Sequence, residues 1–320
     1  MNTTLNQQSY CQFAEDVRLG LSKRIKELPS KYFYDEKGSQ LFQEITNLPE
    51  YYLTKCEKEI LQNCSSNIGA RVGHKNINVY DLGPGDGTKT LLLLNGIAKG
   101  IVTKYLPVDI CADYLKSAIS AIQKHDDTIN CKPILTDYFN IKRFVDSSED
   151  VSKLFVFLGA NIGNFDSDSC QDFIRSVREC LQPGDKFLIG FDLKKDIPVL
   201  NKAYNDNRGV TKKFNLNLLN RINRELGANF DEESFFHYGP YNPCKSSMES
   251  YLISTKYQEV YIESLDESFS FKPYEAIFVE RSKKYDLEEI AELALANGMM
   301  VEENFTDNEK NFCNSLWKVV

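Results

Sequence analysis

The stretch from residue 80 to residue 89, YDLGPGDGTK, constrains the fold of this chain more than any other. It places three glycines at alternate positions, Gly83, Gly85 and Gly87, between a β-forming run and an apolar run that starts at Thr90. Glycine has no Cβ and tolerates positive φ, so its backbone can turn tightly and approach a bound molecule closely. The pattern predicts a strand, a turn and a helix, and in open α/β sheets ligands bind at that end of the strands. A flexible surface turn is the alternative, and the rest of the chain decides between them.

Apolar runs alternate with helical patterns from residue 77 to residue 195. Five of these runs are typical of strands with helical connections, which predicts a parallel, doubly wound sheet in an α/β fold. An amphipathic helix and two β-like runs close the chain and are expected to add an antiparallel end to that sheet. The buried side of this helix is expected to hold Leu287, Ile290, Leu293 and Leu295.

The alternation stops between residues 196 and 283, where a long helical stretch precedes several strand-like runs. This change of pattern predicts two domains, each made of two segments. The α/β domain is expected to comprise residues 56–195 and 284–320, and a second α+β domain residues 8–55 and 196–283.

Acidic residues follow the next two predicted strands. Asp109 ends the first of them, where a carboxylate can accept hydrogen bonds from both hydroxyls of a ribose. Asp137 ends the second and precedes Tyr138 and Phe139, an acceptor and aromatic rings that suit an adenine. Together with the glycines, these residues predict a nucleotide-type cofactor. A nicotinamide-dependent dehydrogenase is disfavoured, because Thr88 stands where the dinucleotide pattern G-x-G-x-x-G has its last glycine.

Charge and cysteine usage exclude several other classes. The chain has 38 Lys and Arg against 46 Asp and Glu, a net charge of −8 that disfavours a nucleic-acid partner. Nine scattered cysteines are typical of reduced thiols in the cytoplasm. The three histidines, His74, His125 and His237, lie far apart, so no metal site is expected. No signal-peptide pattern and no apolar run of the roughly 20 residues that span a bilayer are present, so we expect a cytoplasmic protein without a membrane partner.

Several long blocks of the sequence resemble the L-histidine Nα-methyltransferase family of ergothioneine biosynthesis. The blocks are LPSKYFYDEKGSQLFQEITNLPEYYLTKCE, VYDLGPGDGTKTLLLL, FLGANIGNF, NKAYNDNRGVTKKFNLNLLNRINRELGANFD and VERSKKY. The resemblance implies a class I S-adenosylmethionine-dependent methyltransferase fold, Rossmann-like, with a seven-stranded sheet whose last strand is antiparallel. It also implies that the second domain binds a small-molecule amino acid and that the enzyme, expected to be a monomer, methylates the α-amino group of L-histidine to the trimethylated betaine, hercynine.

The resemblance also implies roles for individual residues. Those expected to bind S-adenosyl-L-methionine are Gly83, Gly85, Lys89, Asp109, Asp137, Tyr138 and Phe139. Those expected to bind the substrate are Tyr51, Asn164, Tyr204, Glu280 and Ser282. Within this set, Asn164 and Tyr204 would hold the carboxylate, and Glu280 with Ser282 would bind the imidazole. Tyr34 and Tyr51 would lie near the amine and act in catalysis.

Two positions depart from the family pattern and leave alternatives open. Ser250 is a small polar residue where histidine-specific relatives carry a bulky apolar one, and Ala160 with Asn161 replaces a Ser-Thr pair. One alternative is therefore an Nα-methyltransferase of another amino acid or amine, such as tryptophan or tyrosine. The other is a non-catalytic module that binds S-adenosylmethionine.

Overall fold

The computed structural model describes residues 2–73, 76–145 and 151–320, and the side chains from residue 10 onward within these ranges. The chain forms two compact units, each built from two segments. The first unit comprises Met1–Tyr51 and Asp196–Ser282, and the second comprises Tyr52–Lys195 and Lys283–Val320. The chain therefore passes between the units three times.

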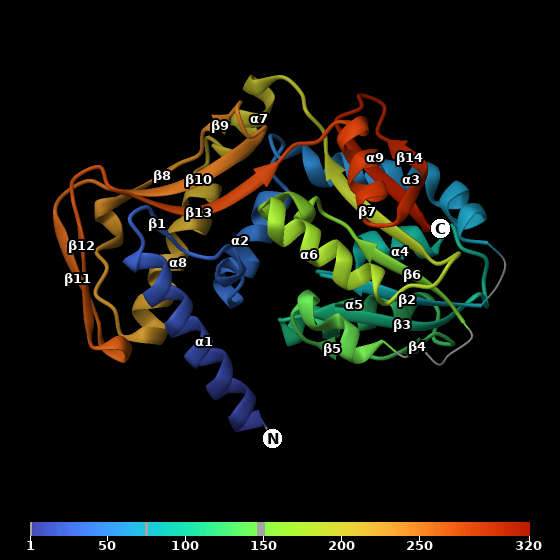
Figure 1. Ribbon diagram of the computed structural model, residues 1–320, viewed down its shortest axis with the longest axis horizontal. Coiled ribbons are helices and arrows are strands. Elements are labelled where there is room, and N and C mark those ends of the chain that lie inside the picture. Colours follow the sequence, from blue (N-terminus) through green and yellow to red (C-terminus); the bar gives the residue numbers. More distant parts are fainter. Residues whose placement is uncertain (1, 74–75, 146–150) are drawn as a thin grey trace. The chain divides into compact units, whose positions relative to one another are not determined.

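The second unit is built around one mixed sheet (Figure 1). Its strand order is β14-β15-β7-β6-β2-β3-β4, and β5 also pairs with β3, so β4 and β5 share one of seven positions. All pairs from β7 to β5 are parallel, whereas β15 is antiparallel to both of its neighbours. The strands are β2 Ile77–Leu82, β3 Val102–Asp109, β4 Asn130–Cys131, β5 Ile134–Leu135, β6 Ser152–Phe157, β7 Lys186–Asp192, β14 Met299–Thr306 and β15 Phe312–Val319. This topology confirms the predicted class I methyltransferase fold.

Helices cover both faces of this sheet. One face packs against α3 Tyr52–Val72, α4 Thr88–Leu94 and α5 Ala112–His125. The other packs against α6 Ser167–Arg178 and α9 Leu287–Ala296, with the short helices η2 Tyr138–Phe144 and η3 Asn161–Asn164 at the ends of strands. The side chain of Asp166 caps α6, and Asp286 with Glu289 forms a capping box on α9, which fixes where each helix begins.

The expected buried side of α9 was partly wrong. Ile290 and Ala294 are fully buried, whereas Leu287 and Leu295 are 45% and 64% exposed. Leu293 is partly buried against the core. Positions 290 and 294 lie on one face of the helix, whereas position 295 is turned about 100° away from position 294. The spacing of apolar residues alone therefore predicted a buried stripe that is wider than the one observed.

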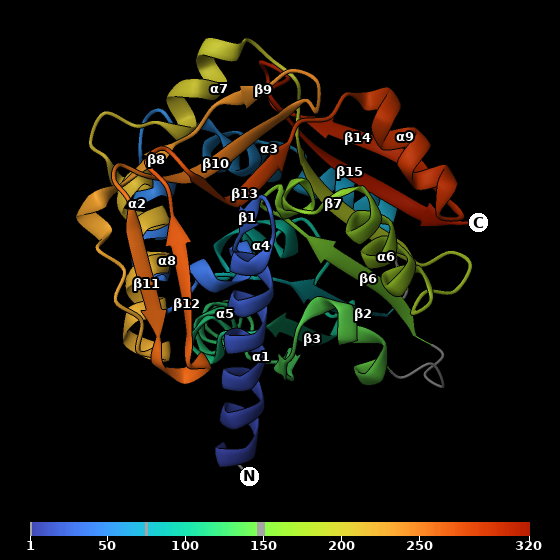
Figure 2. The ribbon, with the colours of Figure 1, turned by 60° about the vertical axis from the view of Figure 1, so that its left-hand side comes forward.

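The first unit has an α+β pattern, as predicted (Figure 2). A sheet of order β1-β13-β10-β8, with β9 beside β10, packs against helices, and a separate hairpin joins β11 to β12. Its helices are α1 Asn2–Ser22, η1 Ser30–Phe33, α2 Glu36–Thr46, α7 Ile197–Tyr204, α8 Val210–Leu226, η4 Glu232–Ser234 and η5 Glu263–Leu265. Its strands are β1 Lys26–Glu27, β8 Phe235–Tyr238, β9 Tyr241–Asn242, β10 Ser247–Ser254, β11 Gln258–Ile262, β12 Glu267–Phe271 and β13 Ala276–Lys283.

The core of the first unit joins segments that are far apart in sequence. The Phe33 ring packs against that of Phe214 in α8, with centroids 4.7 Å apart and the ring planes tilted by 42°. Ile277 and Val279 of β13 are buried in the same apolar cluster. Alternate residues of a strand point to opposite faces, so Glu280 and Ser282 share the face that this cluster does not use.

Candidate active site

The glycine-rich turn between β2 and α4 has three left-handed residues. Gly83, Gly85 and Gly87 all have positive φ, at 71°, 58° and 78°. A Cβ on Gly87 would lie 2.8 Å from the Cα of Ala118 in α5, and a Cβ on Gly83 would lie 3.2 Å from the Tyr138 hydroxyl. The turn therefore needs glycine for two reasons, its backbone conformation and the space that its neighbours occupy.

Asp109 is the last residue of β3, which lies beside β2 in the sheet and is parallel to it. Its carboxylate is 7% exposed and accepts a hydrogen bond from the Cys111 backbone N–H at 2.8 Å. Burial raises the pKa of Asp109 to about 6, because the charged form loses hydration. A largely buried acceptor at this strand end suits the two hydroxyls of a ribose.

Asp137 and the two aromatic residues after it follow β5. The Asp137 carboxylate accepts a hydrogen bond from the Phe139 backbone N–H at 3.0 Å and so caps the short helix η2. The Tyr138 ring packs edge-on against Phe157, with centroids 5.5 Å apart. Phe139 is 41% exposed, whereas Tyr138 is partly buried against the apolar core. Phe139 is thus better placed than Tyr138 to stack on an adenine.

These residues fit the cofactor that the sequence implies. S-adenosylmethionine carries a ribose diol, an adenine and a charged amino-acid end, and it needs acceptors, a flat apolar surface and close backbone approach. Asp109, the pair Asp137 and Phe139, and the Cβ-free turn supply these at the ends of adjacent parallel strands.

Glu57 is a buried residue of this region that sequence reasoning missed. Its carboxylate has no solvent exposure, and it pairs with the Lys89 ammonium at 2.6 Å. Both of its oxygens accept a hydrogen bond from the Gly159 backbone N–H at 3.0 Å. Glu57 therefore ties α3 to the start of α4 and to the turn after β6. It stands inside the block LPSKYFYDEKGSQLFQEITNLPEYYLTKCE, but local pattern does not show that it meets Lys89.

Asp81 is a second missed acid, within the glycine-rich block itself. It is buried in β2, where it accepts hydrogen bonds from the Thr90 hydroxyl and, at 2.7 Å, from the Tyr105 hydroxyl. Burial is the main reason that the pKa of Asp81 is raised to about 6. This carboxylate fixes the first turn of α4 to two neighbouring strands.

The predicted substrate residues fall mostly in the first unit. The Tyr204 hydroxyl, at the end of α7, donates to the Ser282 hydroxyl at 2.8 Å, and both residues are buried. The rings of Tyr51 and Tyr204 lie 6.4 Å apart. Glu280 lies two residues before Ser282 on β13, on the same face of the strand.

Tyr34 and Tyr51, the predicted catalytic residues, meet at a third aromatic ring. Both rings lie edge-on to Phe42 of α2, at 5.5 Å and 6.4 Å between centroids. Phe42 is another residue that sequence reasoning did not assign to the site. An apolar residue at a helical spacing does not indicate from the sequence that its ring will contact two tyrosines from loops.

Asn164, unlike the other predicted substrate residues, belongs to the second unit. It ends η3, which follows the left-handed residue Ala160 at φ 58°. The preceding glycine, Gly163, packs so closely that a Cβ would lie 2.7 Å from the Lys283 carbonyl oxygen. The turn that carries Asn164 is therefore fixed against the segment that follows Ser282.

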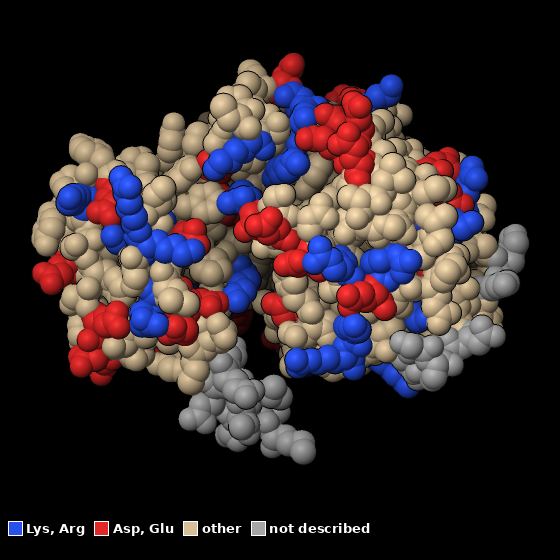
Figure 3. Space-filling model, viewed as in Figure 1, with Lys and Arg blue, Asp and Glu red and all other residues tan. Residues whose placement is uncertain are grey.

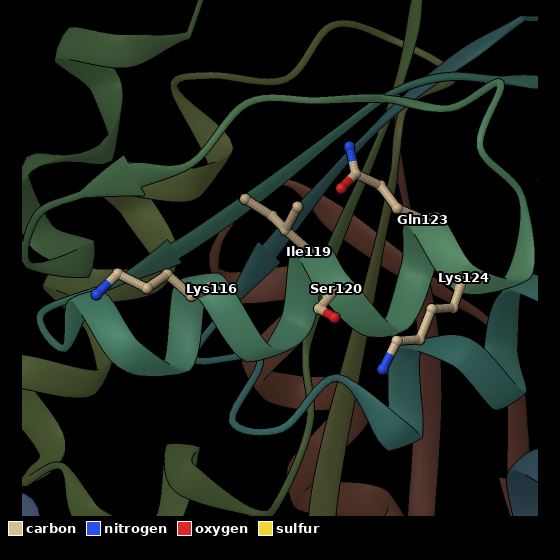
Figure 4. Close-up of a pocket in the computed structure, with 5 residues that line it drawn as sticks. All are labelled: Lys116, Ile119, Ser120, Gln123 and Lys124. Carbon is tan, nitrogen blue, oxygen red and sulfur yellow. The ribbon is translucent and has the colours of Figure 1, made fainter.

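A shallow hollow of about 400 Å³ lies elsewhere, along one helix (Figure 4). Its lining residues all come from α5 and include none of the predicted site residues: Lys116, Ile119, Ser120, Gln123 and Lys124. Among the described residues, no three His, Cys, Asp or Glu side chains gather as a metal site requires. His74 lies outside those residues, so the expectation that no metal is bound stays a prediction.

Comparison with known proteins identifies the family. Residues 13–319 match the family described as histidine-specific methyltransferase, SAM-dependent. The chain belongs to this family. The prediction of an S-adenosylmethionine-dependent methyltransferase is thereby confirmed.

Two similar relatives are histidine N-alpha-methyltransferases. The protein of Mycobacterium tuberculosis is 36% identical over 94% of this chain and 93% of its own length. That of Mycolicibacterium smegmatis is 37% identical with the same coverage. The ergothioneine biosynthesis protein 1 of Schizosaccharomyces pombe is 33% identical over 81% of this chain, which spans only 34% of that longer protein.

Proposed function

We propose that the protein transfers methyl groups from S-adenosylmethionine to the α-amino nitrogen of L-histidine, up to the trimethylated betaine. The observation that carries the substrate is the arrangement of Glu280, Ser282 and Tyr204. An imidazole has two ring nitrogens that act as donor and acceptor. A carboxylate and a hydroxyl on one strand face match the two, and the Tyr204 hydroxyl orients the Ser282 hydroxyl.

The other substrate residues would act on the amino-acid end. Asn164 would donate to the carboxylate, and Tyr204, whose hydroxyl proton goes to Ser282, would line that end of the substrate. Tyr34 and Tyr51 would surround the amine with aromatic rings, which attract a quaternary ammonium product. An α-amine is largely protonated at neutral pH, so its proton must leave before the nitrogen can attack. One of these tyrosines, in its ionised phenolate form, would accept that proton directly or through water.

The cofactor would supply a methyl group on a sulfonium, and the chain would position it. The amino-acid end of the cofactor would contact Gly83, Gly85 and Lys89. Its ribose would bind to Asp109. Its adenine would lie against Asp137 and Tyr138 or Phe139. The alignment of the methyl group with the amine replaces a bimolecular encounter and lowers the barrier.

We propose that this enzyme works as a cytoplasmic monomer without a nucleic-acid partner. All nine cysteines lie in the described ranges and are free, as thiols in a reducing compartment are. No helix in residues 2–73, 76–145 or 151–320 has the length and apolar character to cross a membrane. Lys and Arg are interspersed with Asp and Glu on the face shown in Figure 3, an arrangement that offers little to a phosphate backbone.

Replacement of Glu280 tests the substrate. In a Glu280→Ala variant we expect the Kd of histidine, measured by calorimetry, to rise by roughly 5- to 150-fold, because an imidazole nitrogen loses its partner at a cost of about 1–3 kcal/mol. The matched control is Glu275→Ala, which removes a carboxylate that instead pairs with Lys26 at 2.6 Å. Its histidine Kd is expected to stay at the wild-type value.

The same titrations separate the alternatives. A methyltransferase of tryptophan or tyrosine would bind its own substrate equally well with and without Glu280. A non-catalytic module would bind S-adenosylmethionine and methylate none of the twenty amino acids. Unchanged histidine affinity in Glu280→Ala would refute the imidazole assignment.

A further inference from the structure

One buried carboxylate contacts the chain beside all three of its passages between the units. These passages occur after Tyr51, after Lys195 and after Ser282. The carboxylate belongs to Asp192, the last residue of β7, which lies wholly within the second unit. Asp192 is not among the predicted cofactor or substrate residues.

Three side chains converge on Asp192. The Tyr52 hydroxyl donates to its two oxygens at 3.0 Å and 2.8 Å. The Lys284 ammonium pairs with Oδ2 at 2.7 Å, and both of these side chains have no solvent exposure. The Lys195 ammonium pairs with Oδ1, donates to the Tyr52 hydroxyl at 2.8 Å and lies 4.2 Å from the centre of the Tyr52 ring.

Each partner stands at one passage. Tyr52 is the first residue of the second unit, Lys195 is the last of its first segment, and Lys284 is the second of its returning segment. Tyr52 and Lys284 lie far from Asp192 in the sequence, so only the fold of the chain brings them to one side chain. The cluster therefore links the three places where the chain enters or leaves the second unit.

Backbone hydrogen bonds hold two of these places together. The Tyr285 N–H donates to the Asp192 carbonyl at 2.9 Å, and the Lys194 N–H donates to the Tyr285 carbonyl at 2.8 Å. The Leu193 N–H donates to the carbonyl of Asn311, the residue before β15, at 3.0 Å, and Asp192 pairs with Phe312 at the start of that strand. The outgoing and returning segments are thus joined as a short parallel pair.

The charge balance makes the carboxylate indispensable to the cluster. Two lysines and one aspartate lie out of water, and an isolated buried cation is strongly unfavourable. Burial lowers the pKa of Lys195, which shows the direction of this cost. Buried ion pairs add little net stability compared with apolar side chains, but they fix one geometry.

We propose that Asp192 is a positioning residue that sets the direction of the chain at all three passages and thereby orients the substrate residues next to them. This inference rests on the proposed function, in which Tyr51 and Ser282 bind the substrate. These two residues end the two segments of the first unit, directly before two of the passages. Asp192 itself would touch neither substrate nor cofactor. Its effect is carried by Tyr52 and Lys284.

Amide hydrogen exchange tests the link without any substrate. In Tyr52→Phe, which keeps the ring and removes one donor, we expect exchange to quicken by about fivefold at residues 193–195 and 283–286 as well as at the start of α3. The matched control is Tyr32→Phe, which removes a hydroxyl that donates to Asp16 at 2.7 Å in the first unit. It should leave all three segments unchanged. Asp192→Asn should show the same three-segment pattern more strongly where it folds.

Binding provides the second readout. In Tyr52→Phe the KM for histidine should rise by about three- to tenfold while the Kd of S-adenosylmethionine stays within twofold of the wild-type value. Faster exchange confined to the start of α3, or an equal loss of both affinities, would overturn the proposal. Histidine binding that fails in the wild-type chain would refute the proposed function, whereas the exchange pattern still decides whether Asp192 links the passages.

Discussion

Two buried aspartates dominate the cofactor region at the scale of single residues. Asp81 and Asp109 are both nearly inaccessible, and burial raises the pKa of each to about 6. Asp81 is held by two hydroxyls of the protein, whereas Asp109 accepts from backbone N–H groups alone within the described part of the chain. Asp109 thus keeps acceptor capacity for a ligand, and its protonation is expected to affect binding directly.

The affinity for S-adenosylmethionine should depend on pH through Asp109. We expect the Kd, measured by calorimetry between about pH 5 and pH 7.5, to fall as the pH rises through about 6, since the carboxylate is the better acceptor. In Asp109→Asn the affinity should be lower and nearly independent of pH. A pH dependence that survives in this variant would assign it to another group, such as Asp81.

The same shift has the opposite sign for stability. Because the pKa of Asp109 is raised from its ordinary value of 3.8, the folded protein holds this proton more tightly than the unfolded chain. The contribution of this group to the free energy of unfolding is full below pH 3.8 and is lost as the pH rises through about 6. Tighter binding and weaker stabilisation by Asp109 therefore accompany one another.

Glu57 should affect the cofactor through Lys89. In Glu57→Gln the shape is kept, but an amide replaces the charge that pairs with the Lys89 ammonium, and a charge-assisted hydrogen bond of about 1.5–3 kcal/mol is lost. We expect the Kd of S-adenosylmethionine to rise by about 10- to 100-fold. Glu59→Gln is the matched control, because Glu59 lies on the same helix and accepts a hydrogen bond from the Asn308 backbone N–H at 3.0 Å instead of pairing with Lys89. Equal effects of the two substitutions would contradict this role.

At the scale of elements, the turn between β2 and α4 is fixed by α5. Gly85 and Gly87 share the left-handed conformation, but only Gly87 has α5 within 4 Å of where a Cβ would stand. The two glycines therefore separate backbone strain from packing. The pair is informative because both glycines lie in the same turn, between Leu82 and Thr88.

Alanine at these two positions should give different losses of stability. Gly85→Ala is expected to lower the free energy of unfolding in urea by about 1–2 kcal/mol, which is the cost of the left-handed conformation. Gly87→Ala should cost about 1–3 kcal/mol more, because the new Cβ displaces the backbone of α5 at Ala118. Equal losses would show that α5 does not constrain the turn.

The elements were predictable from the sequence where the signal is local. The strand and turn around Gly83 follow from β-branched residues and glycines, and the parallel pairing of the central strands follows from the alternation of strands with helices. The buried stripe of α9 was not predictable from apolar spacing, since Leu287 and Leu295 face solvent. A helix buries the side that its neighbours cover, and the neighbours are set by the rest of the sheet.

At the scale of the whole molecule, the two units divide the predicted site residues. The cofactor residues and Asn164 belong to the second unit, and the remaining substrate residues to the first. The strand-end pattern indicated most of the cofactor residues and the family resemblance the substrate residues, but neither indicated Glu57 or Asp192. Their partners Lys89 and Tyr52 lie 32 and 140 positions away in the sequence, and only the folded chain brings them together.

The central claim is that this chain methylates the α-amino nitrogen of histidine. The most direct measurement is the product mass after incubation of the purified protein with S-adenosylmethionine and histidine, with Nα-acetylhistidine and tryptophan as parallel substrates. The account predicts mass gains of one, two and three methyl groups on histidine and none on the other two. Methylation of Nα-acetylhistidine would place the reaction on the ring, and turnover of tryptophan in place of histidine would contradict the assignment of Glu280 and Ser282.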